Sequence, residues 1–179
     1  DYLYVQPMEA IGVSTNSVSD STFEFNNWGT GGVDQDTVYA NQLGSIDVNK
    51  YYETKVCVTG NNLMDISKIS FKAQRSDDGV KSIAVRSSAD NFAENYPLSI
   101  GVGSFAKALN SDSTIYIEAD TTRFFSLTAN ISNITDISNN DTLIFRIYAW
   151  NAEDANGTFS IDSLSIAGQT GIIENIENY

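Results

Sequence analysis

The sequence contains no histidine, one cysteine and two prolines in 179 residues. Without histidine, the chain has no Ser-His-Asp or Cys-His catalytic group, no histidine-ligated zinc and no imidazole general base. Cys57 has no second cysteine with which to form an internal disulfide, and its simplest interpretation is a buried thiol on a strand. Any catalysis by this chain would depend on carboxylate, tyrosine or lysine side chains, and we expect no enzyme activity.

Positive charge is scarce as well, because 10 Lys and Arg residues face 23 Asp and Glu residues and the formal net charge is −13. Such a chain lacks the basic patch that neutralises phosphates, so neither nucleic acid nor an anionic membrane is an expected partner. No apolar run approaches the roughly 20 residues of a membrane helix, and the first residues do not form a signal peptide. We therefore expect no membrane insertion and a soluble, secreted or cell-surface domain from which any signal peptide has been removed.

Short runs of alternating apolar and polar residues recur along the chain, separated by clusters of Asn, Asp, Gly and Ser, and none keeps a helical period. About nine strands of this kind predict an all-β fold, a two-sheet antiparallel β-sandwich of the jelly-roll type. Residues 1–168 are predicted to form this module, and the acidic segment 169–179 a C-terminal tail or linker to other domains of a larger chain. The strands are expected at 22–26, 37–41, 51–58, 66–75, 81–87, 113–118, 122–129, 142–150 and 158–167.

Two polar segments are predicted to connect strands directly. The sequence SDDG, from Ser76 to Gly79, is typical of a hairpin turn in which Gly79 supplies a positive φ angle. The strands on either side of it should then be antiparallel neighbours. The loop 151–157, NAEDANG, is predicted to join the last two strands.

Three stretches of the sequence, ISFKAQRSDDGVKSIAVRSSADNF, IFRIYAWNAEDANGTF and IDSLSIAG, form a recognisable set. Together they resemble the jelly-roll accessory modules, similar to carbohydrate-binding modules, of large secreted proteins from Bacteroidetes-type bacteria. The resemblance rests mostly on core and turn positions, covers roughly Ile66 to Gly168 and does not extend to residues 1–50. It implies an extracellular, non-catalytic domain that is often related to carbohydrate.

Period-two alternation in the run TLIFRIYAW places Arg146, Tyr148 and Trp150 on one face of a strand whose other face is wholly apolar. A guanidinium beside two aromatic rings is the chemistry of a sugar site, because aromatic rings stack on sugar rings and the guanidinium donates to hydroxyl or carboxylate groups. The alternative is that Arg146 forms a structural ion pair and Trp150 caps the edge of the sandwich.

Arg75 and Arg86 lie on the two strands that SDDG joins, and a symmetric hairpin would bring them close together. With Arg146 they would line one concave face and recognise an acidic sugar. The alternative is that they pair with the surplus carboxylates of the chain.

Two further aromatic residues are candidate ligand-binding residues. Trp28 lies in the Gly-rich segment FNNWGTGG, where a large ring is difficult to bury on all sides, and exposed aromatic rings on loops are a common binding device. Tyr39 could add to the same platform. For both residues the alternative is ordinary, partly buried packing.

Hard oxygen ligands are plentiful in a chain without histidine, so calcium is the metal that the composition favours. Glu9, Asp154 and Asp162 are the candidate ligands of a structural Ca²⁺ that would tie the first and last strands together. Their spacing does not match an EF-hand loop, and solvated acidic loops are the alternative.

From these observations, the sequence predicts a non-catalytic carbohydrate-binding accessory module whose partner is a polysaccharide or other glycan. One alternative is an adhesion or spacer module of a surface protein. The other, which the missing histidine and the absence of a catalytic motif make weaker, is a carboxylate-dependent glycoside hydrolase or lyase.

Overall fold

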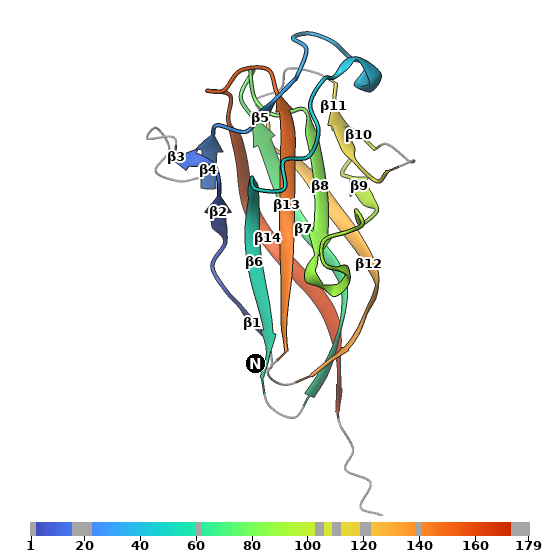
Figure 1. The fold of residues 1–179 in the computed structure, drawn as a ribbon. Coiled ribbons are helices and arrows are strands. Elements are labelled where there is room, and N and C mark those ends of the chain that lie inside the picture. The colour runs from blue at the N-terminus through green and yellow to red at the C-terminus, as the bar shows by residue number, and fades with distance from the viewer. Residues whose placement is uncertain are drawn as a thin grey trace, which may run out of the picture.

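The computed structural model describes residues 3–15, 23–59, 62–102, 106–108, 112–118, 123–138 and 141–172, and its strands form two sheets (Figure 1). We call them sheet 1, in the order β1-β6-β13-β8-β11-β10, and sheet 2, in the order β3-β4-β14-β7-β12-β9. Two short strands join sheet 1 beside this path, β2 on β6 and β5 on β13. In the described part of the chain, helix is limited to two 3₁₀ turns, so no helix could cross a membrane.

Most predicted strands overlap an observed strand, but two observed strands continue well past the predicted end, 125–137 where 122–129 was predicted and 159–172 where 158–167 was predicted. The strands are β1 Leu3–Val5, β2 Glu9–Ile11, β3 Ser14–Thr15, β4 Phe23–Asn26, β5 Gly29–Thr30, β6 Tyr51–Val58, β7 Asn62–Arg75, β8 Ser82–Ser87, β9 Leu98–Ile100, β10 Ala106–Ala108, β11 Ile115–Ile117, β12 Phe125–Ile137, β13 Thr142–Ala152 and β14 Phe159–Ile172. The 3₁₀ turns are η1 Tyr39–Asn41 and η2 Ser88–Asp90. The strand predicted at 37–41 is therefore wrong, since this segment contains η1.

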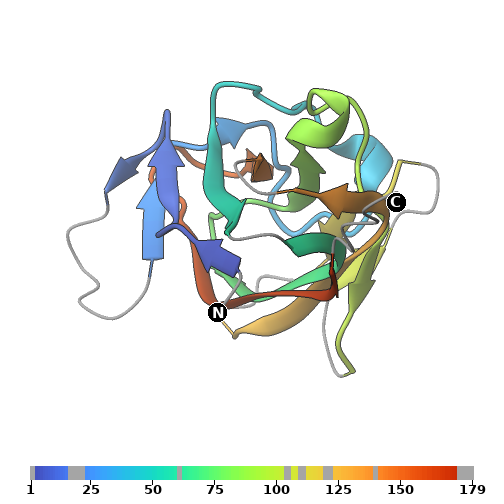
Figure 2. The same cartoon turned by 90° about the horizontal axis from the view of Figure 1, so that it is seen from below.

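Successive strands from β6 onward alternate between the sheets except at β10 and β11, which follow each other in sheet 1: β6, β8, β10, β11 and β13 belong to sheet 1, while β7, β9, β12 and β14 belong to sheet 2. The pairs are nested, with β13 between β6 and β8, and β7 between β14 and β12. This is the crossing pattern of a jelly roll, and the predicted two-sheet β-sandwich is confirmed. Seen from below, the sheets form two layers (Figure 2). The pairing of β5 with β13 is parallel, which the prediction of purely antiparallel sheets did not include.

The core lies between the two sheets. Phe145 and Ile147 of sheet 1 and Ile69 and Leu127 of sheet 2 are fully buried members of one hydrophobic cluster. Burial of apolar surface on this scale is the main term that stabilises the sandwich. The alternate residues of sheet 1 face outward, and these carry the candidate site.

The hairpin predicted at SDDG is wrong, because β7 and β8 lie in different sheets and the turn crosses the sandwich. Gly79 is also not among the residues with positive φ. A side chain at Gly79 would instead place its Cβ 2.2 Å from the carbonyl oxygen of Thr158. Glycine is needed here because the turn packs directly against the start of β14. The loop 151–157 crosses between the sheets at the same end.

Strand β14 continues to Ile172, four residues beyond the boundary predicted for the sandwich, and Gln169 pairs with Asp65 of β7. The remainder of the predicted tail, residues 173–179, lies outside the described residues.

Candidate functional site

The outer face of sheet 1 carries a row of charged side chains. Glu53 on β6, Arg146 on β13 and Arg86 on β8 are register partners, so they lie side by side across three strands. All three point away from the core because their neighbours along each strand point into it. We define the arginine face as Glu53, Arg86 and Arg146 together with Tyr51, which lies on β6, and Phe92, which follows η2.

Arg146 is held between two aromatic rings. Its guanidinium carbon lies 4.2 Å from the ring centroid of Tyr51 and 3.8 Å from that of Phe92. Its Nε donates a hydrogen bond of 2.9 Å to the carboxylate of Glu53, and 22% of its side chain remains exposed. Stacking and the ion pair fix the direction of the guanidinium, which leaves a rigid cationic group at the surface.

Phe92 is placed by an unusual backbone conformation. Asn91 has a φ of 58° and Phe92 a φ of 61°, in the left-handed region that a bulky residue rarely adopts. The backbone N–H of Phe92 donates to the carbonyl oxygen of Ser87, and its own carbonyl oxygen accepts from Arg86. Such a conformation costs about 1–3 kcal/mol and persists where surrounding contacts fix it, a condition that is common at ligand-binding sites.

Arg86 lies next to Arg146 but has different partners. Its Nε donates to the side-chain oxygen of Asn95 at 2.7 Å, its Nη1 donates to the carbonyl oxygen of Phe92 at 3.0 Å, and its guanidinium carbon lies 5.6 Å from the ring centroid of Tyr148. These partners are all uncharged. Among the described residues, Arg86 makes no ion pair with a carboxylate.

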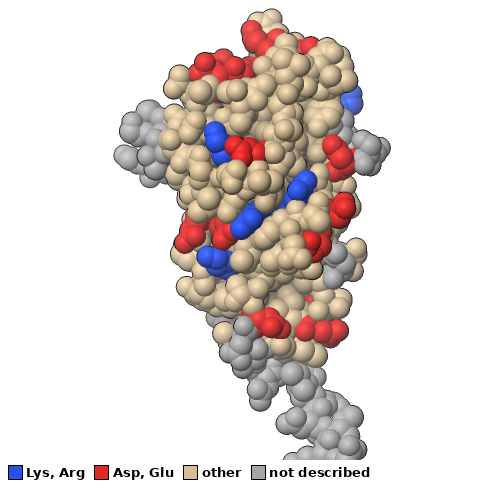
Figure 3. All heavy atoms as spheres, in the orientation of Figure 1, with Lys and Arg blue, Asp and Glu red and all other residues tan. Residues whose placement is uncertain are grey.

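The electrostatics of the arginine face differ from those of the chain as a whole. Lys55 shares the carboxylate of Glu53 with Arg146 and also lies 3.8 Å from Glu9, so two cations pair with two carboxylates here, while Arg86 pairs with neither. Burial lowers the pKa of Arg146, but hydrogen bonds to Tyr148 and Glu53 outweigh it and raise that pKa above the ordinary value. Figure 3 shows Lys and Arg side chains gathered in the middle of this face, with Asp and Glu side chains beside them and also towards the upper and lower ends.

Tyr148 and Trp150 share the outward side of β13 with Arg146, as predicted, but they are only 2% and 3% exposed. The prediction of an exposed aromatic platform there is wrong. The segment between β5 and β6 folds over this part of sheet 1, and Ile46 packs against Tyr148 and Trp150 together with Ala84. A buried ring offers no face to a sugar, so neither residue belongs to the arginine face.

Trp28 is 1% exposed, so its predicted exposure on a loop is also wrong. Its ring packs edge-on against Tyr52 and Phe159 in the core, and its Nε1 donates to the carbonyl oxygen of Phe25. The glycines of this segment do not indicate an open loop, because they allow its backbone to lie directly against sheet 1. A Cβ at Gly32 would lie 2.4 Å from the carbonyl oxygen of Asn151, so the segment needs glycine to approach sheet 1.

Arg75 does not lie beside Arg86, because the turn between β7 and β8 crosses to the other sheet. Arg75 is buried and lies 3.1 Å from the carboxylate of Glu153, which also pairs with the buried Lys81 at 2.6 Å. Lys81 further donates to the carbonyl oxygen of Val33. This buried ion cluster joins the end of β7, the residue before β8, the loop 151–157 and the segment between β5 and β6. Arg75 therefore pairs with a carboxylate, which was the alternative given for it.

Tyr39 lies in η1, half-buried, with its ring 5.6 Å from that of Tyr116. Burial, followed by the charge of Asp112, raises its pKa. Tyr116 is in the same row across sheet 1 as Ser82 and Trp150. Tyr39 therefore helps to cover that row and is not part of the arginine face.

The three predicted calcium ligands lie on separate elements. Glu9 is on β2 of sheet 1 beside Lys55, Asp162 is exposed on β14 of sheet 2, and Asp154 caps its own loop by accepting from the backbone of Asn156. The described residues contain no group of three or more His, Cys, Asp or Glu side chains that could hold a metal ion. Calcium remains a prediction from composition.

Sequence reasoning missed Glu53, Phe92 and Asn95. Alternation in YYETKVCV was a usable signal, because it places Tyr51 and Glu53 on the side of β6 opposite Tyr52. The pairing of β6 with β13 and the backbone conformation at Phe92 depend on tertiary structure, and no local pattern indicates them.

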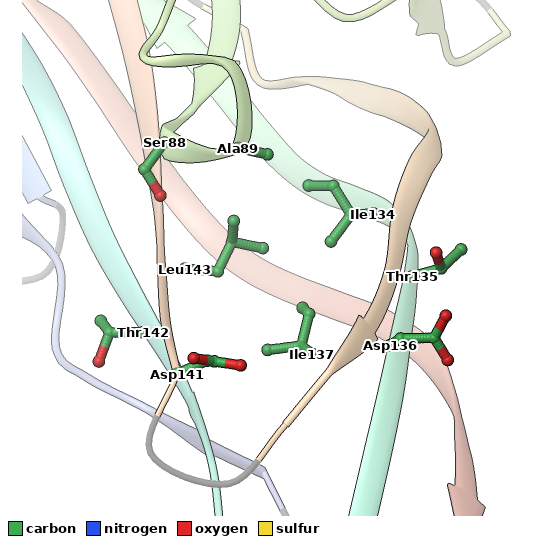
Figure 4. A pocket seen from close by; sticks show the side chains of 9 residues that line it. All are labelled: Ser88, Ala89, Ile134, Thr135, Asp136, Ile137, Asp141, Thr142 and Leu143. Carbon is green, nitrogen blue, oxygen red and sulfur yellow. The ribbon is translucent and has the colours of Figure 1, made fainter.

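A separate pocket of about 340 Å³ lies where β12 ends and β13 begins, below η2 (Figure 4). The side chains of Ile134, Ile137 and Leu143 point into it, while Asp136 points away. Asp141 at its rim accepts hydrogen bonds from the backbone and hydroxyl of Ser138, which lower its pKa. Three of its nine lining residues belong to the core, and the lining contains no aromatic ring and no cation, so it is a weaker candidate than the arginine face.

No family model matches the sequence, and no curated protein matches it. Among solved structures, the chain is similar to the crystal structure of a candidate sugar-binding protein from Bacteroides thetaiotaomicron VPI-5482. The TM-score is 0.40 and the identity 8%, over 91% of this chain and 88% of that chain. A likeness at this level says nothing about the ligand of this chain.

Proposed function

We propose that this chain is a non-catalytic carbohydrate-binding module of a secreted or cell-surface protein, and that its arginine face holds the glycan. The observation that carries the proposal is the partly exposed guanidinium of Arg146, fixed between Tyr51 and Phe92 on the outside of a sheet. A site whose polar group is already oriented loses less entropy when a ligand binds.

The chemistry of the face suits a sugar. Sugar rings have apolar faces that pack on aromatic side chains and hydroxyl groups that bind guanidinium donors and carboxylate acceptors. Tyr51 and Phe92 are half-buried and supply aromatic surface beside Arg146 and Glu53. Tyr4 on β1, which is 55% exposed, extends the same side of sheet 1.

Affinity electrophoresis through gels that contain neutral or acidic polysaccharides tests the proposal. We expect at least one polysaccharide to retard the protein, and Tyr51→Ala and Phe92→Ala each to weaken binding by about tenfold or more. Phe124→Ala is the matched control, because Phe124 is an exposed ring next to β12 of sheet 2. A melting curve for each variant separates lost binding from lost folding.

If no polysaccharide retards the wild-type protein, or if Phe124→Ala weakens binding as much as Tyr51→Ala, the proposal fails. The same polysaccharides should release no reducing sugar when they are incubated with the protein. Release of reducing sugar would instead indicate that the chain is a glycoside hydrolase.

The spacer function is less well supported by the geometry. A spacer needs no oriented binding group, whereas the guanidinium of Arg146 is fixed and partly exposed on the outside of sheet 1.

A further inference from the structure

Arg146 and Arg86 lie directly opposite each other on neighbouring antiparallel strands. Like charges in this arrangement repel and destabilise a sheet. The carboxylate of Glu53 forms an ion pair with Arg146 and a second one with Lys55. The hydrogen-bond partners of Arg86 are all uncharged. The face therefore contains a guanidinium that has no carboxylate partner among the described residues, in a chain whose net charge is −13.

The position of Arg86 is nevertheless fixed. Asn95 accepts from its Nε and donates through Nδ2 to the carbonyl oxygen of Asp112 at 2.6 Å, so the amide is itself oriented. The carboxylate of Asp90, in the adjacent η2, accepts from the backbone N–H groups of Ala93 and Glu94 and is turned towards its own loop. An external carboxylate is the group that would complete this arrangement.

Resting on the proposed function, we infer that the glycan bound at the arginine face carries carboxylate groups, as in a polysaccharide that contains uronic acids. The planar carboxylate of a uronic acid matches the fork of a guanidinium in two parallel hydrogen bonds, which a hydroxyl group does not. The adjacent Tyr51 and Phe92 supply the apolar contact for the sugar ring. The net negative charge of the chain disfavours non-specific attraction to any polyanion, so retention by an acidic glycan has to come from a local site.

The test uses polygalacturonate and alginate, each beside its carboxyl-reduced form, which keeps the polymer but lacks the charge. We expect the wild-type protein to bind at least one acidic polymer about tenfold more tightly than its reduced form. Arg86→Gln should abolish this preference, and Arg86→Lys should restore part of it, because lysine keeps the charge but loses the fork. Lys107→Gln is the matched control, since Lys107 is exposed on β10 and pairs with Glu118.

Each outcome has a distinct meaning. Equal binding of an acidic polymer and its reduced form, or binding of neutral polymers only, would overturn the inference and leave the proposed function standing. Binding of dextran sulfate as tightly as the acidic polymers would also overturn it, because the face would then select charge without selecting carboxylate. No binding to any polymer would remove the proposed function itself. If Arg86→Gln does not fold, the inference is still tested by comparing the affinity of the wild-type protein for each acidic polymer with its affinity for the carboxyl-reduced form.

Discussion

Replacing Trp150 by alanine tests whether the segment between β5 and β6 covers the upper part of sheet 1. Trp150 lies on the outward side of β13, where an uncovered ring would be exposed, yet it is 3% exposed. Tyr148, Ala84 and Ile46 pack around it, and Gly29 is its register partner on β5. If this packing exists in solution, the ring belongs to a second, smaller core outside the main one.

The magnitude follows from the buried area. A tryptophan side chain buries about 200 Å², and roughly 25 cal/mol for each Å² gives an upper value of about 5 kcal/mol. Removal of a large aromatic ring from a core commonly costs about 3–5 kcal/mol. Because the covering segment can partly collapse into the space, we expect a loss in the lower half of this range. For a chain of this size, that corresponds to a fall in the melting temperature of about 10 °C.

Urea denaturation followed by tryptophan fluorescence and a calorimetric melt measure the effect, with Phe124→Ala as the comparison. Phe124 is 40% exposed, and its replacement should change stability by less than about 0.5 kcal/mol. A loss below about 1 kcal/mol for Trp150→Ala would mean that the ring is exposed in solution. The exposed aromatic platform predicted from the sequence would then be correct.

Three further predictions concern stability. Glu153→Gln should destabilise the fold by about 3–5 kcal/mol in urea denaturation, because Arg75 and Lys81 would stay buried without their counter-charge. Glu118→Gln is the control and should have little effect on stability, because its partner Lys107 is exposed. Burial raises the pKa of Tyr116 to about 12, so the contribution of this group to stability should be constant below about pH 10 and be lost as the pH rises from 10 to 12. Tyr116→Phe should flatten that slope in denaturation curves, and an unchanged slope would contradict the assignment. If a structural calcium binds, a chelator should lower the melting temperature, and an unchanged midpoint with no metal by elemental analysis would exclude it.

The sequence predicts a strand well where apolar and polar residues alternate over a long run and the strands on both sides of it are regular. The run 51–58 coincides with β6, and 142–150 lies within β13, because the buried side of each strand is an unbroken series of apolar or small residues. Short strands such as β9 and β10 were missed, since three residues are too few to show a period. Their pairing with β12 and β11 is decided by neighbouring strands.

Turn chemistry proved less informative than strand alternation. The residues of SDDG allow a tight turn, but they do not determine whether the next strand pairs in the same sheet or crosses to the other one. Here β7 pairs with β12 and β14, which leaves no place for β8 beside it. The positions of Arg75 and Arg86 depended on that choice, and this is why one is buried in an ion cluster and the other lies on the surface.

The outer side of β13 shows why parity alone could not define the site. Alternation assigns Thr142, Ile144, Arg146, Tyr148 and Trp150 to one side, and the structure agrees, but a segment more than 100 positions earlier in the chain covers the last two. Arg146 is therefore the first residue on this strand that a ligand can reach. A glycan chain needs continuous open surface, and from Arg146 that surface continues past the half-buried Ile144 to the exposed Thr142, whose row includes Cys57 and Tyr4. We expect Tyr4→Ala to weaken the binding of long oligosaccharides but not of short ones, which calorimetry with ligands of increasing length would measure; an equal loss for all lengths would place the ligand across the strands instead.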